Sequence, residues 1–165
     1  MKIVVVSDTH IPKRAKNFPT RLTMDLETAD LIIHAGDWQT LDVYHNLCRY
    51  GKVIGVTGNV DSSELARKLN SREVVSIRGY RFGIVHGHGT GKTTEKRAKA
   101  AFLDDKVNCI IYGHSHIPIL KSEENLILFN PGSATDKRRQ KSYSYGIITF
   151  KDDVEFQHIF FNEKD

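Results

Sequence analysis

The chain has few of the features that mark secreted, membrane-spanning or disulfide-stabilised proteins. Only two cysteines occur among its 165 residues, Cys48 and Cys109, and they form no C-x-x-C pair. No structural disulfide is implied, and because both lie among apolar neighbours we expect two buried free thiols. No apolar run approaches the roughly 20 residues of a membrane span, and no cleavage site follows the short run at residues 3–6. We therefore expect a cytoplasmic protein with no membrane partner.

A large excess of charge of either sign is also missing. The formal net charge is +4 and the sequence pI is about 9.0, with most of the excess scattered along the chain. This balance suits an anionic substrate and gives weak grounds for nucleic-acid binding, so no nucleic-acid partner is expected. The one basic cluster, residues 137–141 (KRRQK), is interpreted as a solvated loop. It closely follows the polar motif Asn130-Pro131-Gly132-Ser133, so a functional role for the cluster is the alternative.

Apolar, β-branched runs are the commonest pattern that is present. Hydrophobic residues make up 39% and charged residues 27% of the chain, which is typical of one globular domain covering residues 1–165. Runs that suit strands buried on both faces cover residues 3–6, 31–34, 53–56, 82–86, 108–112 and 126–129. Helical composition is found at 40–50, 61–69 and 93–103, and only strand-like stretches follow residue 117. We expect βαβ units first, then an antiparallel meander, in two packed sheets with helices outside.

Six short polar motifs stand at the ends of apolar runs. Their residues offer oxygen and imidazole donors, the ligands that divalent metals take in proteins. Strand ends are where an α/β scaffold collects its functional groups, so six such motifs indicate one shared site. The motifs are Asp8-Thr9-His10, Gly36-Asp37, Gly58-Asn59, His86-Gly87-His88, Gly113-His114-Ser115-His116 and Asn130-Pro131-Gly132-Ser133.

The oxygen donors of these motifs suit a two-metal centre. Asp8 and His10 are two residues apart, so in extended chain they point the same way and can hold one ion together. Asp37 has two carboxylate oxygens and is the natural bridging ligand. Asn59 offers a neutral oxygen. Each motif alone has an ordinary explanation, such as a turn asparagine or a capping aspartate.

The imidazole donors strengthen this interpretation. Four of the chain's eight histidines lie in two strand-end motifs, and His114 and His116 share a side. They can serve one ion each in a pair about 4 Å apart. Two divalent cations bring +4 and two aspartates bring −2, which leaves about +2 for a hydroxide and a phosphodiester. Such a centre suits in-line attack of dimetal-bound hydroxide on phosphorus.

A competing motif lies at residues 87–93 (GHGTGKT). The P-loop pattern needs a glycine five residues before Gly91, where this chain has His86. A nucleotide-triphosphate enzyme would also leave the other histidine and aspartate motifs unexplained. We interpret the glycines as a loop that passes close to the metals.

Taken in order, the six motifs resemble the calcineurin-like metallophosphoesterase superfamily. The size and the closing N-P-G-S-A indicate its small YfcE-like phosphodiesterase branch. The resemblance implies an α/β fold, a four-layer α/β/β/α sandwich of two mixed sheets. It also implies a metal-dependent hydrolase acting on small or nucleotide-like phosphodiesters, with two divalent ions, usually Mn²⁺, although Fe, Ni or Zn share these ligands. By matching position, the first metal would take Asp8, His10, Asp37 and His116, and the second would take the bridging Asp37 with Asn59, His86 and His114.

One position departs from the family pattern. Many members have a histidine directly after the Gly-Asn motif, where it assists the leaving group, and this chain has Val60. His88, or the loop with Arg138 and Arg139, is the candidate substitute, so His88 joins Asp37 and Asn59 as predicted catalytic residues. Asp61 has two equal interpretations, orienting a ligand histidine or capping a helix.

A second resemblance gives the alternative function. The opening Asp8-Thr9-His10-Ile11-Pro12 and its continuation to Pro19 are similar to the retromer scaffold subunit of the same fold. That resemblance implies a non-catalytic, protein-binding scaffold. The enzyme is preferred because Asp37 and Asn59 are present where a scaffold can dispense with them. The expected partner is a small phosphodiester substrate. The sequence is also compatible with a homo-oligomer.

Overall fold

A computed structural model describes residues 1–164. Its strands are β1 (Lys2–Val6), β2 (Leu31–His34), β3 (Val53–Gly55), β4 (Arg72–Ile77), β5 (Tyr80–Val85), β6 (Cys109–Tyr112), β7 (Ile119–Glu123), β8 (Leu126–Asn130), β9 (Tyr143–Phe150) and β10 (Val154–Phe161). Its helices are α1 (Thr20–Leu26), α2 (Leu41–Cys48), α3 (Ser63–Lys68) and α4 (Thr94–Ala100). None of the helices in this described part is long and apolar enough to cross a membrane.

The strands form two mixed sheets of five. The first sheet has the order β10-β9-β1-β2-β3, in which β1, β2 and β3 are parallel and β9 pairs with β1 antiparallel. The second has the order β4-β5-β6-β8-β7, in which β5, β6 and β8 are parallel. Parallel strands send their carboxyl ends to one edge, so the loops that follow β1, β2, β3, β5 and β6 can meet.

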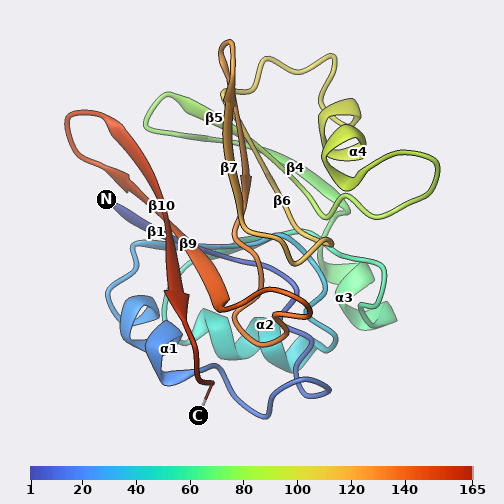
Figure 1. Ribbon diagram of the computed structural model, residues 1–165, viewed down its shortest axis with the longest axis vertical. Coiled ribbons are helices and arrows are strands. Elements are labelled where there is room, and N and C mark those ends of the chain that lie inside the picture. Colours follow the sequence, from blue (N-terminus) through green and yellow to red (C-terminus); the bar gives the residue numbers. More distant parts are fainter. Residues whose placement is uncertain (165) are drawn as a thin grey trace.

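Three apolar clusters separate four layers. Alternate residues of β1 face opposite ways, with Ile3 and Val5 between the sheets and Val4 and Val6 against helices. The outer face of the first sheet is covered by α1, α2 and α3, and the outer face of the second by α4. Figure 1 shows α1 and α2 on one side of the molecule and α4 on the other. The predicted α/β sandwich of two mixed sheets is confirmed.

The predicted C-terminal meander is wrong. After β6 the chain forms β7 and β8 in the second sheet, and then β9 and β10 return to the first sheet beside β1. Strand composition does not say which sheet a strand joins, because both sheets bury apolar faces. Two elements were not expected at all, α1 and β4. The expectation of two buried thiols is correct for Cys109 and wrong for Cys48, which lies exposed on α2.

Candidate metal centre

The loops that follow five parallel strands carry the candidate ligands. Asp8 and His10 follow β1, Asp37 follows β2, and Asn59 follows β3. From the second sheet, His86 follows β5 and the pair His114 and His116 follows β6. The site is therefore assembled by both sheets, at the edge where their parallel strands end.

The first group of donors joins Asp8, His10 and His116. The Nε2 atoms of the two imidazoles are 3.3 Å apart. The Oδ1 atom of Asp8 lies 3.4 Å from Nε2 of His116 and 3.9 Å from Nε2 of His10. All three residues are buried, and the three atoms lie near enough to coordinate one cation.

The second group joins Asp37, His86 and His114. The Oδ2 atom of Asp37 lies 3.2 Å from Nε2 of His86 in this group and 3.7 Å from Nε2 of His10 in the first. Asp8 also spans the groups, with Oδ1 at 3.8 Å from Nε2 of His86. The two groups are thus neighbours, and Asp37 reaches both.

Two buried atoms in these groups indicate that the residues suit a cation. Among residues 1–164, Oδ1 of Asp8 and Nε2 of His86 are buried without a hydrogen-bond partner. A buried carboxylate oxygen and an imidazole nitrogen left unpaired are costly, and a divalent ion satisfies both. The donor set of two carboxylates and four imidazoles is the set that first-row divalent metals take.

Backbone carbonyls orient two of the imidazoles. His86 Nδ1 lies 2.8 Å from the carbonyl oxygen of Ala35, and His116 Nδ1 lies against the carbonyl oxygen of Asp136. A carbonyl only accepts, so Nδ1 carries the proton in each ring and the Nε2 lone pair faces the site. This arrangement is typical of metal-bound histidine.

The backbone of the site is held in an unusual conformation. Five candidate ligands have positive φ, with values of 54° at Asp8, 45° at His10, 59° at Asp37, 66° at His114 and 59° at His116. Such residues are uncommon outside glycine and cluster at functional sites. The surrounding fold therefore holds these side chains in place at a cost in backbone free energy.

Glycines let the ligand loops approach one another. A Cβ atom on Gly58 would lie 2.1 Å from Oδ1 of Asp37, and one on Gly113 would lie 2.7 Å from Oδ2 of Asp8. Only glycine fits at these two contacts between loops.

Burial and charge act in opposite directions on the acidity of the site. Burial would raise the pKa of Asp37, but the contact with His86 outweighs it and lowers the pKa to about 2. Burial would lower the pKa of His86, but Asp37 and the charge of Asp8 outweigh it and raise the pKa. Burial does lower the pKa of His10 and of His114. The two carboxylates therefore favour positive charge at Nε2 of His86, the same atom whose lone pair would bind a cation.

Asn59 and His88 lie at the margin of the two groups. Asn59 is exposed and precedes Val60, whose amide donates to Oδ1 of Asp37 at 3.1 Å. His88 is also exposed, and its ring centroid lies 5.5 Å from that of His86 and 6.4 Å from that of His114. His88 is thus next to both ligand-type histidines of the second group.

Asp61 takes neither role expected for it. Its carboxylate accepts the backbone amides of Asp37, Gln39 and Gly58, at 3.1, 2.8 and 2.7 Å. The hydroxyl of Ser62, not Asp61, caps α3. Asp61 therefore joins the loops after β2 and β3, and burial raises its pKa despite these hydrogen bonds.

The Asn130–Ser133 motif supports the ligand loops from behind. The Asn130 amide donates to the carbonyl oxygen of Gly113 at 2.9 Å, and the Ser133 hydroxyl donates to that of Asp8 at 2.8 Å. The position of this motif after an apolar run, shared with the ligand motifs, predicts that it lies near the site but does not predict this supporting role.

An open hollow adjoins the site. It measures about 420 Å³, and its walls include Pro12, Lys13, Gln39 and Val60. These residues neighbour the ligand positions in sequence, since Pro12 follows His10 by two residues and Gln39 follows Asp37 by two. The hollow offers an apolar wall and one cationic side chain beside the two groups.

Two mixed sheets with paired Asp/His groups at their strand ends define a metallophosphoesterase-type fold and site. A family model described as the calcineurin-like phosphoesterase superfamily domain matches residues 1–153. The chain belongs to this superfamily, and the resemblance predicted from the motifs is confirmed.

Individual relatives agree with this family. A probable metallophosphoesterase of Methanothermobacter thermautotrophicus is 33% identical over 138 residues, which cover 84% of this chain and 80% of the relative. A phosphodiesterase of Methanocaldococcus jannaschii is 29% identical, with 80% and 83% covered. Among solved structures, Vps29 of Entamoeba histolytica complexed with Zn²⁺ has a TM-score of 0.76 at 23% identity, with 98% and 100% covered. The last likeness is one of fold.

Proposed function

We propose that this chain is a phosphodiesterase that uses two divalent cations, Mn²⁺ first among them, to hydrolyse small or nucleotide-like phosphodiesters. The observation that carries the proposal is the position of Asp37, whose Oδ2 atom is 3.2 Å from His86 Nε2 and 3.7 Å from His10 Nε2. One carboxylate between two donor groups is the arrangement that a shared ligand of two ions requires.

Each residue of the site has a proposed task. Asp8, His10 and His116 hold one cation, and His86, His114 and the Asn59 amide oxygen hold the other, with Asp37 between them. Bound cations of this kind lower the pKa of water and offset charge developing on phosphate oxygens. Two divalent cations and the two buried carboxylates would together carry a net charge of about +2, which favours binding of an anionic diester.

The chain's own residues favour diesters with good leaving groups. Val60, 43% exposed, lies where many relatives of this fold are expected to carry a histidine, so the leaving group meets an apolar side chain there. His88 is the proposed proton donor because it stands beside the second group. Burial lowers its pKa, so less of the imidazole is protonated near neutral pH and its help to a leaving group is modest there. A proton donor at position 88, and not at position 60, suits a leaving group that needs little protonation.

A metal-by-substrate screen tests the proposal. Full-length protein prepared without chelator or His-tag is assayed with Mn²⁺, Fe²⁺, Ni²⁺ and Zn²⁺ on bis(p-nitrophenyl) phosphate, p-nitrophenyl phosphate and an alkyl monoester. We expect Mn²⁺-dependent turnover, fastest on the activated diester. Turnover of the alkyl monoester that equals that of the diester would contradict the proposed substrate class.

Two substitutions connect the activity to the site. Asp37→Asn keeps the shape of the bridging side chain but removes its charge, and His86→Ala removes one ligand. We expect each to reduce kcat/KM by more than about 100-fold, with loss of bound metal. Asp104→Asn and His45→Ala, at exposed positions, are the matched controls and keep activity.

The alternative function is a protein-binding scaffold. It draws on the likeness in fold to Vps29 and on the opening Asp8-Thr9-His10-Ile11-Pro12. The scaffold function would be favoured if the protein binds metal, loses that binding in Asp37→Asn, and turns over none of the phosphoesters. The proposed location is the cytoplasm, which agrees with two cysteines that form no disulfide.

A further inference from the structure

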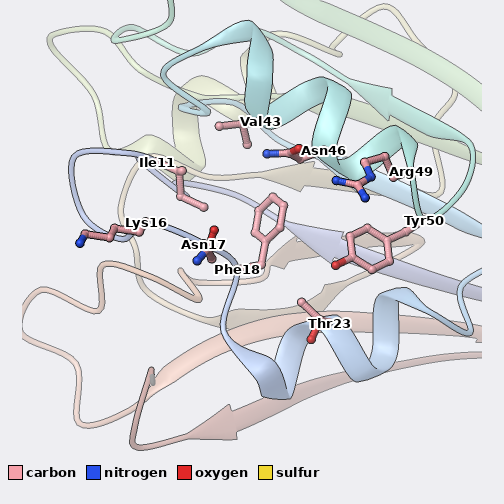
Figure 2. Close-up of a pocket in the computed structure, with 9 residues that line it drawn as sticks. All are labelled: Ile11, Lys16, Asn17, Phe18, Thr23, Val43, Asn46, Arg49 and Tyr50. Carbon is pink, nitrogen blue, oxygen red and sulfur yellow. The ribbon is translucent and has the colours of Figure 1, made fainter.

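A second pocket lies away from the two donor groups, between α1 and α2. It has a volume of about 390 Å³, within the range of small-molecule sites. Its walls come from the loop at residues 11–19, from α1, from α2 and from the two residues that follow α2 (Figure 2). The pocket belongs to the outer face of the first sheet, whereas the candidate ligands stand at the strand ends.

Four polar side chains of this pocket are exposed and have no protein partner. Within residues 1–164, no hydrogen bond or ion pair is formed by the side chains of Lys16, Asn17, Asn46 or Arg49, whereas the Thr23 hydroxyl donates to the carbonyl oxygen of Thr20. No acidic residue among residues 1–164 lines the pocket, so none of these neutralises its two cations there. Unpaired guanidinium and amide groups grouped in one concave surface are available for a ligand.

The apolar part of the pocket is aromatic. The ring of Phe18 rises between the two helices, and Tyr50 lies across from it with its hydroxyl directed toward Phe18 (Figure 2). Arg49 stands beside Tyr50, and Lys16 points outward at the opposite rim. A planar ring can lie against Phe18 while a group carrying negative charge meets Arg49.

We propose that this pocket binds a small aromatic anion of the nucleoside monophosphate class. The guanidinium of Arg49 takes the phosphate in its planar fork, and Phe18 supports the base. The Asn46 and Asn17 amides can donate to and accept from the polar edge of a base. An inorganic anion would leave the aromatic wall unused, and an uncharged ring would leave Arg49 without a partner.

The pocket wall is joined to the candidate metal centre. Ile11 lines the pocket and directly follows His10. The Ile11 amide donates to the carbonyl oxygen of Trp38 at 3.2 Å, and the His10 amide donates to that of Asp37 at 3.1 Å. The proposal itself needs no metal and no turnover, so it stands or fails separately from the proposed function.

The test is a titration of the full chain with AMP, followed by ¹⁵N–¹H NMR with chelator present to keep phosphate–metal contacts out. We expect saturable shifts at residues 11, 16–18, 46, 49 and 50. Adenosine is expected to bind at least about tenfold more weakly, because a charge-assisted contact is lost. Shifts confined to the loops of Asp8, Asp37 and His86, or no saturable shifts, would overturn the assignment.

A matched pair of variants isolates Arg49. Arg49→Gln is expected to weaken AMP binding about tenfold. Arg67→Gln, at an exposed arginine in the last turn of α3, is expected to change it less than about twofold. Equal affinity of the two variants would refute the role of Arg49. Intact spectra of both variants show that the fold is kept.

Two further ligands identify the chemistry. Inorganic phosphate that binds as tightly as AMP would refute the aromatic part of the site. Indole-3-acetate that binds as tightly as AMP would retain an aromatic-anion site but overturn the nucleotide class.

Discussion

At the scale of single residues, the site depends on how closely its loops approach. Asp37 and Asp8 are nearly fully buried, and each is met by a backbone that leaves no room for a further carbon at Gly58 or Gly113. Two buried carboxylates so close to four imidazoles are stable only if positive charge accompanies them. Small changes in these glycines should therefore disturb the charge balance of the site.

Gly58→Ala tests this dependence. The added Cβ would lie 2.1 Å from Oδ1 of Asp37, so the carboxylate must move away from both donor groups. We expect metal affinity, measured by calorimetric titration, to fall at least about tenfold. Gly51→Ala is the control, because its nearest contact would be an ordinary 3.6 Å. Equal metal affinity in both variants would contradict the crowding argument.

Val60→His tests the missing proton donor. The position is exposed beside Asp37, so an imidazole there can reach a leaving group. We expect turnover of a diester with an alkyl leaving group to rise about tenfold or more, and turnover of bis(p-nitrophenyl) phosphate to change little. Val60→Leu serves as the control for size. A uniform change on both substrates would argue against a role in protonation.

At the scale of elements, periodicity predicted the strands better than their pairing. The runs at 3–6, 31–34 and 53–56 became neighbouring parallel strands because each alternates between two buried faces. β4 was not predicted because most of its residues are half-exposed or exposed, which leaves no apolar run. α1 was not predicted because it buries only Leu22 and Leu26 and has no side-chain cap.

The arrangement of the strands also explains which site residues the sequence predicts. Residue types at strand ends indicated the ligands, because parallel strands bring their carboxyl ends to one edge. Support from Asp61, and from Ser133 to Asp8, runs through backbone atoms. Backbone contacts between distant loops leave no characteristic pattern in a sequence, so these roles needed the structure.

Arg97 of α4 gives a prediction for a whole loop. Its Nε donates to the carbonyl oxygen of Gly87 at 2.8 Å, and its guanidinium also contacts the Lys92 carbonyl and the Thr94 hydroxyl. We expect Arg97→Ala to speed amide hydrogen exchange across residues 88–92. The exposed neighbour Lys96→Ala is the control. Unchanged exchange in the Arg97 variant would show that the loop is held by other contacts.

At the scale of the whole molecule, a partly buried network connects the first strand, α1 and β9. The Asp25 carboxylate accepts from Lys2 Nζ at 2.7 Å, from Arg21 at 2.7 Å and from the Tyr145 hydroxyl. Burial alone would raise the pKa of Asp25, but these donors outweigh it and the pKa is lowered below 3.8.

This network predicts an acid-dependent stability. A lowered pKa in the folded state adds stability above pH 3.8 that is lost as pH falls through the folded pKa. We expect Asp25→Asn to reduce the free energy of unfolding at pH 7 by about 1–2 kcal/mol. In urea unfolding followed by circular dichroism, the gap between wild type and variant should narrow as pH drops from 4 toward 2. Asp152→Asn, at an exposed turn, is the control. A difference in unfolding free energy between wild type and Asp25→Asn that widens as pH falls would contradict a lowered pKa of Asp25.

The pairing of β1 with β9 has a consequence for the order in which the chain is built. Val4 lies opposite Ile147, so the central strand of the first sheet gains one of its two neighbours only after most of the chain exists. During synthesis, β1 can pair with β2 early, but the backbone N–H and C=O groups on its other edge stay unpaired until residues 143–150 leave the ribosome. A nascent chain stalled before that point would present this edge to other chains. Premature termination near the C-terminus is therefore a greater danger to this protein than the modest length of the missing piece suggests.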